Sequence, residues 1–164
     1  MIRIVDNFLD EGFLDYVQHI LPRMDYRLHG SVGKLNFFNT TDPFMPDRSF
    51  DYIMQRIADL DQLNNIRLLR SYVNLAPCGE IYEGEYHQDD GDITALFYPM
   101  PWSTEWQGGT DFDGQIIDYV TNRLVLFDAD IPHKSVSHSC PTGFRYTVAF
   151  KIEATWIHEN STGN

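Results

Sequence analysis

Residues 143–154 read GFRYTVAFKIEA, and this stretch decides how the chain is expected to fold. It is rich in β-branched and aromatic residues, which is typical of a β-strand. Side chains of a strand alternate between two faces. The apolar face carries Phe144, Tyr146, Val148, Phe150 and Ile152, and the other face carries Arg145, Thr147, Ala149 and Lys151. We expect the apolar face to pack on the core and the polar face to line a functional cavity.

The rest of the chain supplies further strands and two helices. Strands are expected at 2–5, 66–76, 93–100, 123–128 and 144–152, with shorter candidates at 85–89, 110–112, 116–120 and 134–138. Apolar residues at helical spacing predict helices over about 10–23, capped by Asp10, and about 50–60. This order favours an α+β class. So many short strands favour a barrel or a two-sheet jelly roll, braced from outside by the two helices.

A chain of 164 residues is expected to form one domain. Within it we expect an N-terminal strand and supporting helices over 1–65, a β-rich core over 66–153 and a tail over 154–164. Residues 29–48 are polar and contain prolines, so they are expected to be irregular. The stretch PCGEIYEGEY, at 77–86, is expected to be a mobile loop of the kind that can close over a substrate.

Composition excludes several classes of function. The net charge of −12 argues against binding to nucleic acid or to an anionic membrane, because both would repel this surface. The N-terminus does not read as a secretory signal, and no apolar run approaches the ~20 residues that span a bilayer. Two cysteines, Cys78 and Cys140, make no disulfide framework. We therefore expect a cytoplasmic protein.

The acidic segment EYHQDDGD, at 85–92, contains a histidine two residues before an aspartate. On a strand, His87 and Asp89 would share a face and could converge on one metal ion. His133, which follows the apolar stretch LVLFDADIP, would add a third ligand from another strand. Two imidazoles and one carboxylate form the facial set of non-haem Fe(II) oxygenases, which leaves the opposite metal positions open. A structural zinc site would need four closed ligands, usually including thiolates.

Other polar residues fit this site less well. Asp90 would point away from His87 on a strand, and Asp92 follows Gly91 and is expected to cap a turn. His138 would face away from His133, in a surface or structural role. The remaining histidines are expected to be ordinary surface residues: His19, His29 and His158.

Arg145 faces the expected cavity. A guanidinium keeps its charge and can grip a carboxylate with two hydrogen bonds, so beside a metal it suits a small carboxylate-bearing co-substrate. Taken alone, Arg145 would fit a salt bridge at the surface or the sheet edge better.

Three stretches resemble a known family: YHQDDGDITALFYPMPWSTEWQGGTDFDG (86–114), NRLVLFDADIPHKSV (122–136) and GFRYTVAFK (143–151). They resemble the 2-oxoglutarate/Fe(II)-dependent dioxygenases, in particular the prolyl 4-hydroxylase-like branch. That family has H-x-D, a strand ending in tyrosine, a Gly-Gly turn, Pro-His and a basic residue on the last main strand. This chain has them in that order, as His87–Asp89, Tyr98, Gly108–Gly109, Pro132–His133 and Arg145.

The resemblance implies a double-stranded β-helix of the jelly-roll, cupin-like kind. It implies Fe(II) bound by His87, Asp89 and His133, with 2-oxoglutarate and O2 as co-substrates. Arg145 would anchor the distal carboxylate of 2-oxoglutarate, Tyr98 would donate to it, and Thr147 and Tyr72 would lie nearby. The implied activity hydroxylates a substrate C–H, first of all in a prolyl residue of a peptide or protein, and releases succinate and CO2.

Other functions stay open at this point. The substrate can be a free amino acid or another small molecule, because a fold does not fix a substrate. A cupin-like jelly roll can bind metal without oxygenase chemistry, but such a protein has no need of Arg145 and Tyr98. A non-catalytic β-sandwich, in which His87 and Asp89 are a surface pair, would bind no metal. The oligomeric state is left open.

Overall fold

The computed structural model describes residues 1–29, 37–39, 49–60, 63–79 and 85–157. These ranges leave out most of the irregular segment expected at 29–48, half of the loop expected at 77–86 and the end of the tail. Among the described residues, no helix is long and apolar enough to cross a membrane.

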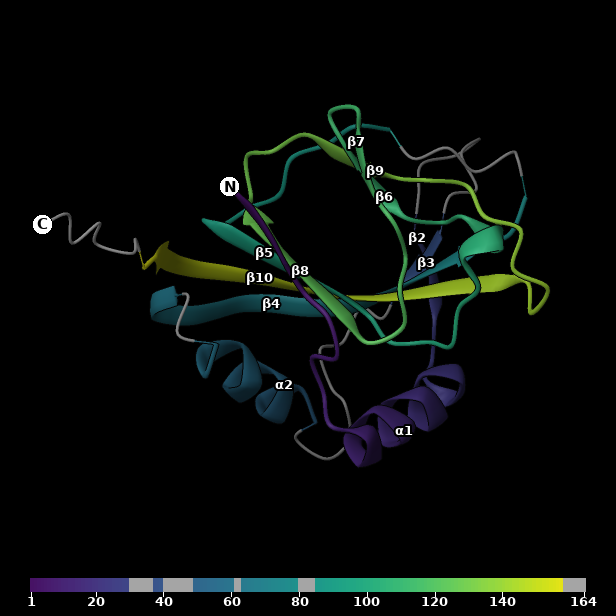
Figure 1. Ribbon diagram of the computed structural model, residues 1–164, viewed down its shortest axis with the longest axis horizontal. Coiled ribbons are helices and arrows are strands. Elements are labelled where there is room, and N and C mark those ends of the chain that lie inside the picture. The colour runs from purple at the N-terminus through teal and green to yellow at the C-terminus, as the bar shows by residue number, and fades with distance from the viewer. Residues whose placement is uncertain (30–36, 40–48, 61–62, 80–84, 158–164) are drawn as a thin grey trace, which may run out of the picture.

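Seven strands form one large antiparallel sheet (Figure 1). Their order across the sheet is β1 (Ile2–Val5), β8 (Arg123–Asp128), β5 (Ile93–Tyr98), β10 (Phe144–Trp156), β4 (Leu63–Pro77), β3 (Phe37–Asn39) and β2 (Arg27–His29). The second sheet has the order β7 (Gln115–Ile117), β6 (Thr110–Phe112) and β9 (His133–Ser135). It lies across one face of the large sheet, which confirms the predicted two-sheet jelly roll.

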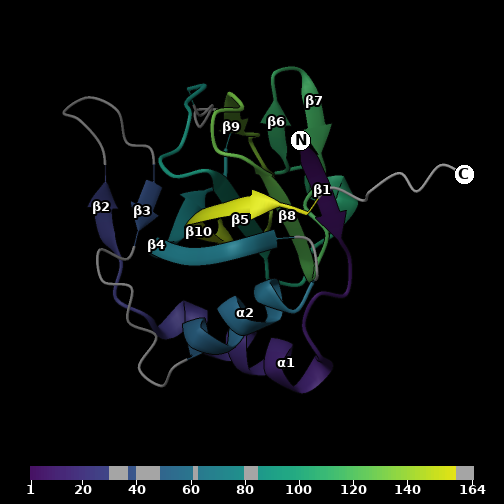
Figure 2. The same cartoon turned by 90° about the vertical axis from the view of Figure 1, so that its left-hand side faces the viewer.

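The helices cover the opposite face of the large sheet (Figures 1 and 2). Helix α1 (Glu11–Ile20) continues into the short 3-10 turn η1 (Leu21–Arg23), and α2 (Ser49–Ala58) packs beside it. The Asp10 carboxylate accepts the Phe13 N–H at 2.9 Å, so Asp10 is the predicted N-cap. A second 3-10 turn, η2 (Thr104–Trp106), lies between β5 and β6.

Strand β10 divides two hydrophobic cores, as its alternation predicts. Val148, Phe150 and Ile152 join the core between the large sheet and the helices, which includes Val17 and Ile57. The opposite face of β10 contributes Ala149 to the core between the two sheets, which is built from Leu96, Tyr98, Phe112, Ile117, Tyr119, Val125, Phe127 and Ala149. The buried polar side chains on the face of Ala149 therefore lie between the sheets: Arg145, Thr147 and Lys151.

Several predicted bounds are wrong. Residues 85–89 form no strand; His87 makes only an isolated bridge with His133. Strand β9 is displaced and shorter than the predicted 134–138, β5 ends two residues before the predicted 100, and β7 ends before the predicted 120. Strands β4 and β10 are longer than predicted because they pair with each other as far as Thr155–Asn64 and Trp156–Leu63. Strand β10 therefore runs three residues into the expected tail.

Candidate metal centre

The main chain brings the acidic segment against the turn before β9. The N–H of His87 donates to the carbonyl of His133, and the N–H of His133 donates back to His87, both at 3.0 Å. The Asp89 N–H donates to the carbonyl of Ala129 at 2.8 Å. These bonds hold two segments that are far apart in the sequence in an antiparallel arrangement. The side chains of His87, Asp89 and His133 consequently lie on the same side.

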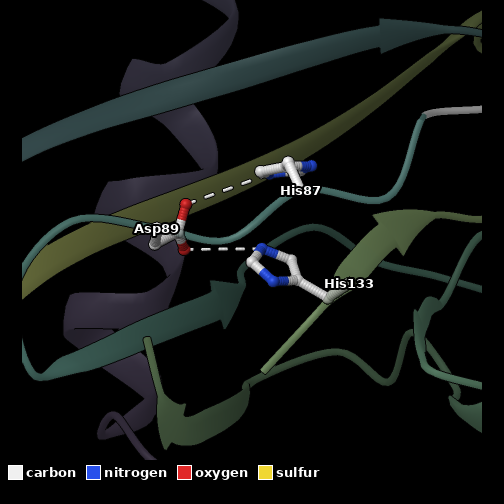
Figure 3. A group of neighbouring side chains, drawn as sticks. All are labelled: His87, Asp89 and His133. Atoms are coloured by element: carbon white, nitrogen blue, oxygen red, sulfur yellow. Dashed lines mark ion pairs between the residues drawn. The ribbon is translucent and has the colours of Figure 1, made fainter. Parts of the chain in front are cut away.

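The three side chains point toward one another (Figure 3). The Nε2 of His133 lies 3.4 Å from Oδ2 of Asp89, and the Nε2 of His87 lies 3.9 Å from Oδ1. One ligand atom from each residue falls within 4.8 Å of the other two. Asp89 and His133 have almost fully buried side chains, whereas the His87 side chain is 57% exposed. The cluster therefore has one open side, at His87.

Both imidazoles are oriented for a metal. The Nδ1 of His87 lies 3.1 Å from the carbonyl of Glu85, and the Nδ1 of His133 lies 2.9 Å from the carbonyl of Ile131. Because a carbonyl only accepts, each Nδ1 carries a proton, which leaves each Nε2 as the ring atom that can bind a metal. Burial lowers the pKa of His133, against the raising effects of the Ile131 carbonyl and Asp89. The donor set of two imidazoles and a carboxylate fits Fe(II).

Asp89 is held in its charged form. Burial alone raises the pKa of a carboxyl, but the charge and hydrogen bond of Lys151 and the hydrogen bond of Thr94 outweigh it, so the pKa of Asp89 is lowered. The Thr94 hydroxyl donates to Oδ2 at 2.7 Å, and the Lys151 ammonium pairs with the same oxygen. Burial lowers the pKa of Lys151, and the charge and hydrogen bond of Asp89 oppose this effect. Sequence reasoning missed a role for Lys151, although the alternation of β10 already puts it on the face of Arg145.

Arg145 and Thr147 are buried between the sheets. The charge of Arg145 acts on Tyr98, Tyr119 and His138, so these groups surround it. Gly108 also lies close, because a Cβ added there would sit 3.5 Å from Cδ of Arg145. The guanidinium is thus enclosed by two tyrosines, a neutral histidine and the Gly-Gly turn.

Tyr98 already has a hydrogen-bond partner. Its hydroxyl donates to Oγ1 of Thr110 at 2.7 Å, and its ring stacks on Tyr119 with centroids 4.5 Å apart. Burial raises the pKa of Tyr98, so the phenol stays protonated. Thr110, which sequence reasoning missed, therefore fixes the direction of this hydroxyl beside Arg145.

Comparison with known proteins adds information at the level of the fold. No protein-family model and no curated protein matches the chain. Solved structures do match: the non-haem α-ketoglutarate-dependent epimerase SnoN from nogalamycin biosynthesis superposes with a TM-score of 0.73 at 16% identity, over 99% of this chain and 86% of SnoN. The chain has the fold of the 2-oxoglutarate/Fe(II)-dependent oxygenases. This confirms the resemblance noted in the sequence at the level of fold.

Two further solved structures with this fold contain 2-oxoglutarate. HygX from Streptomyces hygroscopicus, with nickel and 2-oxoglutarate bound, has a TM-score of 0.69 at 13% identity, over 93% of this chain and 82% of HygX. The viral collagen prolyl hydroxylase of Paramecium Bursaria Chlorella virus-1, in complex with 2-oxoglutarate, has a TM-score of 0.69 at 15% identity, over 94% of this chain and 96% of that one.

Within this oxygenase fold, Tyr72 lies at the Asp89 end of the site. Its ring is contacted by Lys151, at 5.5 Å from the centroid, and by Arg70, at 5.4 Å. Burial and the charge of Asp89 raise the pKa of Tyr72. Strand register pairs Tyr72 with Ala149, whereas Arg145 pairs with Ala76. Tyr72 is thus nearer to the metal ligands than to Arg145 along the strands.

The polar residues set aside in the sequence have other partners. Asp90 pairs with Arg70 at 2.6 Å, and the Asp92 carboxylate accepts the Ala154 N–H at 3.1 Å. His138 is buried: its Nδ1 accepts the Cys140 N–H at 3.3 Å, and its Nε2 lies 3.0 Å from the carbonyl of Ala76. His138 therefore has a structural role.

Proposed function

We propose that this chain is an Fe(II)- and 2-oxoglutarate-dependent dioxygenase that hydroxylates a substrate C–H bond. The observation that carries the proposal is the convergence of three metal-directed atoms, Nε2 of His87, Nε2 of His133 and a carboxylate oxygen of Asp89. The overall reaction would convert 2-oxoglutarate, O2 and a C–H group into succinate, CO2 and a C–OH group.

The roles of the residues follow from their positions. His87, Asp89 and His133 would hold Fe(II) on one face and leave the other positions to the co-substrates. Bound Fe(II) would supply the dioxygen chemistry, which no side chain can perform. Arg145 would bind the distal carboxylate of 2-oxoglutarate through paired hydrogen bonds. Tyr98 and Thr147, which flank Arg145 between the sheets, would complete that binding site, and Tyr72 would lie beside the metal ligands.

The first candidate substrate is a prolyl residue in a peptide or protein. Support comes from the order of motifs in the sequence and from the fold shared with the viral collagen prolyl hydroxylase. The exposed edge of His87 gives the metal cluster an open side on which a chain segment can dock. A small-molecule substrate is the second candidate, because HygX shares the fold and is known with hygromycin B bound.

Succinate production tests this function. The iron-loaded protein is incubated with 2-oxoglutarate and O2 over a panel of proline-containing peptides, and succinate and the mass of each peptide are measured. We expect a substrate to raise succinate release and to gain the mass of one oxygen atom, and His133→Ala to abolish both. Binding of Fe(II) without any consumption of 2-oxoglutarate would contradict the proposed function.

A further inference from the structure

A buried lysine contacts the metal-binding carboxylate. Lys151 is 2% exposed, and its ammonium pairs with Oδ2 of Asp89 and donates to Oγ1 of Thr94 at 3.3 Å. We propose that Lys151 is a positioning residue that holds one oxygen of Asp89 and places a positive charge beside the metal, favouring the ferrous over the ferric ion. This inference rests on the proposed function, since it takes iron as the metal.

The fold is built to bring Lys151 to this oxygen. Strand register sets Lys151 of β10 directly opposite Thr94 of β5, and both side chains reach the same carboxylate. Gly91 allows the segment after Asp89 to approach β10, because a Cβ there would lie 2.9 Å from the Ile152 carbonyl. The lysine, the threonine and the glycine together fix Asp89 against the sheet.

Contact with Lys151 and Thr94 decides how Asp89 can bind. Two donors engage Oδ2, which also lies 3.4 Å from Nε2 of His133, whereas Oδ1 accepts from neither donor and lies 3.9 Å from Nε2 of His87. A carboxylate with one oxygen engaged in this way offers a metal its other oxygen. Asp89 would therefore act as a one-oxygen ligand and leave two neighbouring metal positions to a chelating co-substrate.

Charge gives Lys151 a second effect. A metal bound at Nε2 takes the place of a proton there, so both imidazoles would be neutral ligands and the carboxylate would be the anion of the ligand set. The ammonium offsets that negative charge, and burial of both side chains leaves little solvent to screen the pair. A nearby positive charge disfavours a trivalent ion more than a divalent one. Lys151 would thus hold the site in the ferrous state that the proposed reaction requires.

Measurement of the iron midpoint potential tests this inference. Iron-loaded wild type, Lys151→Met and Lys151→Arg are titrated anaerobically with redox dyes, and Fe(II) affinity is measured by competition with a chelator. We expect Lys151→Met to lower the ratio of ferrous to ferric affinity by at least about tenfold. For a one-electron couple this corresponds to a midpoint potential about 59 mV lower. Lys151→Arg, which keeps the charge, should restore most of the wild-type value.

Arg70 provides a matched control. It lies opposite Lys151 on the β4 side, but its side chain is 55% exposed and pairs with Asp90. Solvent screens such a charge, so Arg70→Met should leave the midpoint close to the wild-type value. If near-UV circular dichroism shows that Lys151→Met does not fold, Lys151→Gln takes its place. Glutamine keeps a hydrogen-bond donor and removes the charge.

The outcomes separate the two proposals. If the wild type binds Fe(II) but the midpoint potential is unchanged or higher in Lys151→Met or Lys151→Gln, the role of Lys151 is overturned. The proposed function would still stand. An equal shift in Arg70→Met also overturns it, because the effect would then be one of general charge. A wild type that binds no Fe(II) overturns both.

Discussion

Asp89 and Asp90 are adjacent in the chain, and their carboxylates have opposite environments. The Asp89 side chain is 4% exposed and is contacted by Thr94 and Lys151, while the Asp90 side chain is 54% exposed and pairs with Arg70. The side chain of Asp89 therefore points inward and that of Asp90 outward. One carboxylate therefore joins the histidine cluster, and its neighbour supplies a natural control.

Asparagine at these two positions should separate metal binding from general charge. Asp89→Asn removes an anionic ligand, so we expect Fe(II) affinity to fall at least about 100-fold, beyond the 10–100-fold typical of losing a supporting contact. Asp90→Asn should change it by less than about threefold, since exposed pairs contribute little. Anaerobic chelator competition measures both. Equal losses in the two variants would place the metal elsewhere.

Arg145 should govern co-substrate binding without affecting the metal. Loss of one partner of a buried charge pair costs about 2–5 kcal/mol, so Arg145→Met should weaken 2-oxoglutarate binding by about 30-fold or more. Fe(II) affinity should stay within about threefold of wild type, because Arg145 is not among the convergent ligands. Anaerobic calorimetry on the iron-loaded protein measures the two affinities. Unchanged 2-oxoglutarate binding would remove Arg145 from the site.

A methyl group added at Gly108, in the Gly-Gly turn, should lower the free energy of unfolding more than one added at Gly114. The φ of Gly108 is +84°, and a Cβ there would meet Cβ of His138 at 2.8 Å and Cζ2 of Trp102 at 2.9 Å. Gly114 has a similar φ of +95°, but open space around it. We expect Gly114→Ala to cost about 1–2 kcal/mol of unfolding free energy from strain. Gly108→Ala should cost about 1–3 kcal/mol more, from overpacking.

Urea unfolding of the two alanine variants gives these free energies. Because Gly108 also lies against the Arg145 side chain, Gly108→Ala should weaken 2-oxoglutarate binding in addition, and Gly114→Ala should not. Equal stabilities of the two variants would show that the turn has room that the structure does not indicate.

His138 should make stability depend on pH. Burial lowers its pKa in the folded chain, against the raising effects of backbone hydrogen bonds. Above about pH 6.5 the residue is neutral in both states, so this stability is fully present. Below that pH the unfolded chain takes up a proton that the folded chain resists, and stability falls by up to about 1.4 kcal/mol per pH unit.

Comparison with His138→Gln isolates this effect. The variant keeps a donor for the Ala76 carbonyl but has no titrating group. Metal-free wild type should lose more unfolding free energy than His138→Gln between pH 7 and pH 5.5, as urea titrations would show. A wild type and variant with parallel pH profiles would mean that His138 takes up its proton equally in both states.

Sequence periodicity predicted the elements whose two faces differ. Strand β10 alternates between apolar residues that contact the helices and polar residues that lie between the sheets, and β5 alternates in the same way, with Thr94, Leu96 and Tyr98 on the inner face. Helix α1 shows its cap and its apolar face directly in the sequence. These signals are local, so a single chain is enough to read them.

Other features depend on contacts that the sequence does not show. Strands β2 and β3 have three residues each, which is too short for a periodic pattern. The segment at His87 does not form the predicted strand and makes one isolated bridge, with His133 at the start of the short β9. Tyr98 contacts Thr110, and Lys151 contacts Asp89. Strand register and packing between the sheets fix both pairs, and neither is visible in the sequence.

The most direct test of the account is an anaerobic titration followed by visible absorption. Metal-free protein receives Fe(II) and then 2-oxoglutarate, with Asp89→Ala as the comparison. We predict a metal-to-ligand charge-transfer band that appears only when both are present and is lost in Asp89→Ala. Tight Fe(II) binding without a band would instead indicate a metal-binding jelly roll without this co-substrate, and no binding of Fe(II) would contradict the metal centre itself.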